Sequence, residues 1–70
     1  MQTRLQAIRE RRNLSRAQLA VKANVSERMI VNYESPATYA RPARVNTMKA
    51  VAEALGVKMA TIFDRTGRAR

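Results

Sequence analysis

The sequence contains no cysteine and no histidine, and these two absences exclude several classes of protein. Without cysteine there is no disulfide scaffold, no thiolate metal ligand and no cysteine nucleophile. Without histidine, neither a serine–histidine catalytic pair nor a histidine-ligated metal site can be assembled. The five acidic residues are scattered along the chain and form no carboxylate cluster for metal binding or acid–base chemistry. We therefore expect neither an enzyme nor a protein with a metal or another cofactor.

Long apolar segments and aromatic residues are also scarce. No apolar run approaches the roughly 20 residues that a membrane-spanning helix needs. The N-terminal MQTRLQAIRE lacks the apolar centre of a signal peptide. The aromatic residues are Tyr33, Tyr39 and Phe63, and so few disfavour binding of single-stranded nucleic acid by base stacking. We expect a soluble, cytoplasmic protein with no membrane partner.

What the chain has in excess is positive charge. Fourteen Lys and Arg against five acidic residues give a formal net charge of +9 and a pI near 11.6. Such a charge destabilises a compact small domain by self-repulsion and indicates an anionic partner. Nucleic acid is the first candidate. An anionic membrane surface is disfavoured, because the basic residues are spread over all faces rather than along one stripe.

Five segments show the apolar spacing of short helices, and none shows the alternation of a strand. Helices are expected over residues 2–12, 45–55 and 58–64, and two more after the capping residues Ser15 and Ser26. The side chains expected to face the core are Leu5, Ile8, Leu19, Ala20, Ala23, Val25, Ile30, Tyr33, Val45, Met48, Val51, Ala52, Leu55, Val57, Met59, Ile62 and Phe63. The fold class is therefore all-α, a compact five-helix bundle.

One domain accounts for residues 1–64. Residues 65–70, RTGRAR, form a basic tail without a pattern and are expected to be mobile. Residues 35–43 hold both prolines and no apolar periodicity, which predicts a loop. Asn13 and Gly56 stand where a left-handed residue ends a helix.

The central stretch, SRAQLAVKANVSERMIVNYE, predicts two short helices joined by a tight turn. Ser15 and Gln18 have the spacing of a capping box. Asn24 stands at the turn and tolerates a positive φ. Ser26 caps the next helix, and Glu27 in its first turn favours the helix dipole. The second of these helices carries polar side chains on its outer face.

These residues resemble the Cro/C1-type helix-turn-helix family of phage repressors and related bacterial regulators. The resemblance rests on L-S-x-x-x-L-A from Leu14, A-N-V-S from Ala23, Ile30, Glu34, A-E-A-L-G-V from Ala52, and I-F from Ile62. It spans about residues 4–64 and implies a lambda-repressor-like fold. The third helix of that fold reads double-stranded DNA in the major groove, without a cofactor.

The resemblance also implies which side chains reach the bases. The residues on base-reading positions are Ser26, Glu27, Arg28 and Asn32. Arg28 is suited to guanine, Asn32 to adenine, and Glu27 to the amino group of cytosine. The alternative for each is a solvated helix face. Met29 can touch a thymine methyl group, but we favour a partly buried side chain that packs on the core.

Contacts with phosphate and one ion pair complete the expected interface. Phosphate contacts are expected from Ser15, Arg16, Gln18, Arg9, Arg41 and Arg44, and the alternative is a generally basic solvated surface. The resemblance pairs Arg9 with Glu34 as a partly buried ion pair. If both side chains are instead exposed, their interaction contributes only about 0–1 kcal/mol.

A single helix-turn-helix of this size reads few base pairs, so we expect a homodimer on two half-sites. The resemblance places the dimer interface at Val57, Lys58, Met59 and Ile62, next to Gly56. For Met59 and Ile62 the alternative is the core, and Tyr39 is another apolar candidate for the interface.

The leading hypothesis is a transcriptional regulator of repressor or controller type, encoded by a bacterium or phage and associated with the nucleoid when bound. One alternative is an antitoxin that binds its own promoter and a toxin protein. Another is a DNA-binding module of a longer protein.

Overall fold

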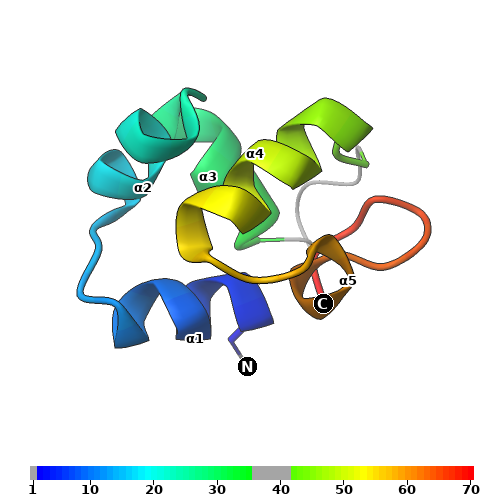
Figure 1. Cartoon of the computed structure of the whole chain (residues 1–70), viewed down its shortest axis with the longest axis horizontal. Helices are drawn as coiled ribbons and strands as arrows, with labels where there is room; N and C mark the ends of the chain where they lie inside the picture. The colour runs from blue at the N-terminus through cyan, green and yellow to red at the C-terminus, as the bar shows by residue number, and fades with distance from the viewer. Residues whose placement is uncertain (1, 36–41) are drawn as a thin grey trace.

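The structure, a computed structural model, describes residues 2–35 and 42–70 as five short helices (Figure 1). They are α1 (Arg4–Arg11), α2 (Arg16–Ala23), α3 (Glu27–Tyr33), α4 (Val45–Leu55) and α5 (Met59–Ile62). The described residues form no strand beyond one isolated antiparallel bridge between Phe63 and Ala69. None of the helices in these two ranges is long and apolar enough to cross a membrane. The predicted all-α class is confirmed.

Local capping explains where the first three helices begin. Thr3, Ser15 and Ser26 have extended backbones, and each side chain accepts a hydrogen bond from the backbone N–H three residues later. The predicted capping box is complete, because the Gln18 side chain also accepts the N–H of Ser15 at 2.8 Å. These caps fix the start of α2 and α3.

Left-handed residues end three of the helices, as the sequence predicts. The φ angles are +57° at Asn13, +57° at Asn24 and +71° at Gly56. Asparagine tolerates this conformation better than other residues with a side chain, and glycine adopts it without steric cost. The left-handed Asn24 closes α2 and allows α3 to begin three residues later.

The core lies between the helix-turn-helix and the other three helices. Its largest fully buried side chains are Phe63, Leu5, Leu19, Ile30, Leu55, Ile62 and Val51. The rings of Tyr33 and Phe63 meet edge to face, with centroids 5.7 Å apart, a favoured aromatic geometry. Val45 was expected in this core, but it is 63% exposed, and the buried residues of α4 lie in its second half, at Val51, Ala52, Ala54 and Leu55.

The chain after α5, expected from the sequence to be a tail without a pattern, forms a hydrogen-bonded turn. Helix α5 ends at Ile62, and Phe63 is extended. The Asp64 carboxylate accepts hydrogen bonds from the N–H and hydroxyl of Thr66 and from the N–H of Arg68. This turn sends the chain back toward α5, where the N–H of Arg70 donates to the Ile62 carbonyl at 2.9 Å. Residues 65–70 are therefore hydrogen-bonded parts of the domain.

The Asp64 turn predicts a specific acid sensitivity. Its pKa is lowered by the hydrogen bond from the Thr66 hydroxyl and by that from the N–H of Arg68. Because the pKa is lower in the folded state, the charged carboxylate contributes its full stabilisation at any pH above the ordinary aspartate pKa of 3.8. The contribution is lost as the pH falls through the lower folded-state pKa. Asp64→Asn keeps an acceptor oxygen but removes the charge. Its Tm should therefore fall less than that of the wild type when the pH is lowered from neutral to below the folded-state pKa of Asp64. Equal losses in thermal melts of the two proteins would contradict this assignment.

Candidate nucleic-acid interface

Helix α3 presents one face to the core and the other to solvent. Ile30 and Tyr33 are buried on its inner face. The expected base-reading residues lie on or cap the same helix: Ser26, Glu27 and Arg28 are exposed, and Asn32 is half-buried. The structure thus brings these four residues together on a helix that is anchored from behind. Val31, 36% exposed, adds an apolar contribution to the outer face.

The side chains of this outer face differ in how free they are. Within the described residues, neither Glu27 nor Arg28 makes a side-chain hydrogen bond or ion pair, so both can bind another molecule. The hydroxyl of Ser26 accepts the N–H of Met29 at 3.2 Å as the helix cap, so its remaining capacity is mainly as a donor. Met29 is half-buried and packs against the core, which supports its interpretation as a core residue.

The start of α2, the helix that precedes α3, is exposed to solvent. Ser15, Arg16 and Gln18 are all exposed. The capping box uses the Ser15 hydroxyl and the Gln18 carbonyl oxygen as acceptors. What remains for an anion is the Gln18 amide NH₂, the first N–H groups of α2 and the Arg16 guanidinium.

A buried carboxylate joins three helices at this point. Arg9 of α1 donates from Nε to Glu34 Oε2 at 2.6 Å and from Nη2 to Oε1 at 3.2 Å. The side chains of Arg9 and Glu34 are only 8% and 2% exposed. The hydrogen bond to Glu34 raises the pKa of Arg9, although burial opposes this. The predicted ion pair between Arg9 and Glu34 is therefore present as a bidentate, buried contact.

Arg16 is a third member of this cluster that the sequence did not predict. Its Nε donates to Glu34 Oε1 at 2.9 Å, while its side chain stays 45% exposed. The terminal nitrogens of Arg16 make no bond within the described residues. Arg9 also donates from Nη1 to the Leu14 carbonyl, so its guanidinium is almost fully used. Arg16 is thus the member of the cluster that can reach an anion from outside.

The remaining predicted residues are divided between surface, core and the part of the chain that is not described. Arg44 is exposed and stands at the N-cap position of α4. Arg41 and Tyr39 lie outside the described residues. Val57 is half-buried, Lys58 is exposed and Met59 is 38% exposed.

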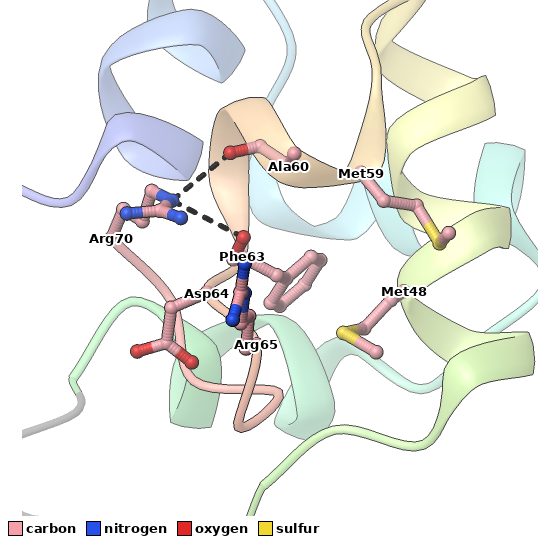
Figure 2. Close-up of a pocket in the computed structure, with 7 residues that line it drawn as sticks. All are labelled: Met48, Met59, Ala60, Phe63, Asp64, Arg65 and Arg70. Carbon is pink, nitrogen blue, oxygen red and sulfur yellow. Dashed lines mark hydrogen bonds between the residues drawn. The ribbon is translucent and has the colours of Figure 1, made fainter.

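Ile62 is completely buried, which favours the alternative that it belongs to the core rather than to a dimer interface. Its side chain points into the core because α5 has a single turn, which has one inner position. Beside it, a surface hollow of about 320 Å³ is lined by Met48, Met59, Ala60, Phe63, Asp64, Arg65 and Arg70. In Figure 2 the Met48 and Met59 side chains lie on the same side of this group of residues, with the Phe63 ring between them and Arg70.

The buried cluster predicts a large effect of removing one charge. Glu34→Gln keeps the shape of the side chain but leaves the buried Arg9 without its counter-charge, which typically costs about 3–5 kcal/mol. That is a large part of the roughly 5–15 kcal/mol that stabilises a small domain. Urea denaturation should therefore show a severely destabilised variant. Glu10→Gln is the matched control, because Glu10 is 3.9 Å from Arg9 but 48% exposed, and an exposed pair contributes about 0–1 kcal/mol. Similar losses in the two variants would refute the central role of Glu34.

Two comparisons with known proteins bear on the identity of the chain. No curated protein matches the sequence significantly. The sequence does match the model of a protein family, described as helix-turn-helix, over residues 5–62. That match covers most of the chain, from α1 to the last residue of α5. It contains the capped helices α2 and α3, the turn at Asn24 and the buried cluster around Glu34. The chain therefore belongs to the Cro/C1-type helix-turn-helix family of DNA-binding regulators.

Proposed function

We propose that the protein is a sequence-specific transcriptional regulator of repressor or controller type that reads the major groove with α3. The observation that carries this proposal is the anchored helix with free polar side chains on its outer face. The major groove admits one α-helix, and its base edges form a distinguishable pattern of donors and acceptors. Such a regulator, encoded by a bacterium or phage, acts on DNA in the cytoplasm.

Arg28 and Asn32 are the main base readers in this proposal. Arg28 is exposed and unpaired within the described residues, so its guanidinium can donate twice to guanine O6 and N7. Asn32 lies one turn later on the same helix and can make a bidentate contact with adenine. Glu27 adds a contact with cytosine, and the hydroxyl of Ser26 donates a hydrogen bond to the DNA.

The phosphate contacts come from the start of α2 and the start of α4. Arg16 is held by Glu34 through Nε, which leaves its terminal nitrogens directed to other partners. Because it is already positioned, less side-chain entropy is lost when it binds a phosphate. Arg44, Ser15 and Gln18 contribute further contacts. Arg9 supports this surface from behind rather than touching the DNA, since its side chain is 8% exposed.

A homodimer on two half-sites gives this small domain enough specificity. The surface for it is Val57, Lys58 and Met59 together with the hollow that Met48 and Phe63 line (Figure 2). Exposed methionines adapt their shape to a partner surface. Ile62 supports this surface from the core.

One observation favours an antitoxin as the second candidate. Val21 on α2 is 82% exposed, and together with Ala17 it gives α2 an apolar outer surface, which suits a protein partner. Coexpression with the neighbouring gene of the same operon discriminates the two functions, because an antitoxin suppresses the toxicity of that gene product.

Base readers and phosphate contacts should respond differently to substitution. Selection from random duplexes should yield a preferred site, to which Arg28→Ala binds about 1–3 kcal/mol more weakly with relaxed preference at one position. Arg16→Ala should weaken binding to all duplexes similarly and reduce the salt slope of log K by about one. Lys49→Ala, which removes an exposed charge on α4 outside the proposed DNA surface, is the control for net charge. Equal affinity of the wild type for all duplexes would exclude a specific regulator.

The dimer is tested at Met59. Met59→Asp places a charge on the proposed interface and should reduce binding of a second protomer on a two-half-site duplex, with one half-site still occupied. Sedimentation velocity with the labelled duplex measures the stoichiometry. Val21→Asp, at another exposed apolar position, should leave two protomers bound. One wild-type protomer per duplex would contradict the dimer.

A further inference from the structure

The turn after α5 contacts the segment that leads into α4. The N–H of Ala43 donates to the Gly67 carbonyl at 2.7 Å, and both residues are buried. In Figure 1 this turn, coloured orange to red, lies beside the chain just before α4. The last residues of the chain therefore fix the residue that directly precedes Arg44.

Gly67 is required at this contact for two reasons. Its φ is +86°, which residues with a side chain rarely adopt. A Cβ atom at this position would lie 2.6 Å from the Ala43 carbonyl oxygen and 3.2 Å from its nitrogen. Both neighbours are backbone atoms, so a side chain at Gly67 forces the two segments apart.

The Asp64 carboxylate holds the other end of the turn. It accepts three hydrogen bonds, from Thr66 and from the Arg68 N–H, and the Asp64 carbonyl accepts the N–H of Gly67 at 3.1 Å. Arg70 closes the segment, because its side chain donates to the carbonyls of Ala60 and Phe63 (Figure 2). Hydrogen bonds therefore hold the turn at both ends, and its Gly67 carbonyl accepts the N–H of Ala43.

Arg44 is the side chain that gains from this arrangement. Its carbonyl accepts the N–H of Met48 in the first turn of α4, and its neighbour Ala43 is bonded to Gly67. The backbone of Arg44 is therefore held on both sides. Its exposed guanidinium has no ion pair with any described residue.

We propose that the segment 64–70 is a positioning element of the DNA interface, in which Gly67 holds Arg44 in place for contact with a phosphate. This inference rests on the proposed function, since it assigns a role in DNA binding. Gly67 itself touches no DNA, and it acts through the hydrogen bond to Ala43. The competing explanation is that the segment binds DNA directly through the charges of Arg65 and Arg68.

The experiment measures duplex affinity and its salt dependence for the full chain. Arg44→Ala should weaken binding about fivefold to tenfold and lower the salt slope by about one, as expected for one lost charged contact. Gly67→Ala, which changes no charge, should reproduce both effects. The double variant should bind no more weakly than Arg44→Ala alone, because both changes remove the same contact.

Asp64→Ala tests the positioning role independently of Gly67. It is informative because it changes the net charge in the direction that should favour DNA binding. Loss of one carboxylate raises the net charge from +9 to +10, which by electrostatics alone strengthens DNA binding. The positioning role instead requires weaker binding and a lower salt slope. Arg65→Ala is the matched control, since Arg65 is exposed and should reduce affinity less than Gly67→Ala does.

The outcomes separate this inference from the proposed function. If the wild type binds no duplex, the proposed function itself fails. If the wild type binds but Gly67→Ala and Asp64→Ala leave affinity and salt slope unchanged, the positioning role is wrong. Additive losses in the Gly67→Ala, Arg44→Ala double variant also overturn it. Thermal melts identify a temperature at which every variant is folded, and a variant that is less stable but binds normally shows a merely structural role.

Discussion

The carboxylate of Glu34 is the single group on which the arrangement of the first three helices depends. It stands at the end of α3 and binds Arg9 of α1 and Arg16 of α2. A lone buried charge is strongly unfavourable, so the Arg9 guanidinium and the Glu34 carboxylate can be buried only together, while Arg16 adds its charge from the exposed side. The cluster consequently fixes the distance between the start of α2 and the end of α3. These are the two elements that the proposed function directs toward DNA.

The helix caps, the turn and the core also determine how α2 and α3 are oriented. Caps at Ser15 and Ser26 set where α2 and α3 begin, and the left-handed Asn24 sets the angle between them. Ile30 then anchors α3 in the core. The exposed face of α3 is in this way determined by residues that do not themselves face solvent.

The sequence predicted the features that depend on short spacing, and these are confirmed: the capping box, the turn at Asn24, and the boundaries of α4. The bidentate pair of Arg9 and Glu34 was predicted only through the family resemblance. What was missed depends on geometry between distant residues. Arg16 and Glu34 have no helical spacing that links them, and Gly67 meets Ala43 across a large sequence separation. The tail seemed patternless because Asp64, which organises its turn, precedes it. The base-reading assignments remain predictions.

The bond between the N–H of Arg4 and the backbone oxygen of Arg70, 2.7 Å long, brings the two ends of the described chain together. They meet on the side of the molecule formed by α1 and α5 (Figure 1). A short peptide linker can therefore join them with little distortion of the fold. Closing the backbone into a ring in this way restricts the unfolded chain far more than the folded one. The domain is thus suited to cyclisation and to circular permutation, with new ends opened at another surface loop.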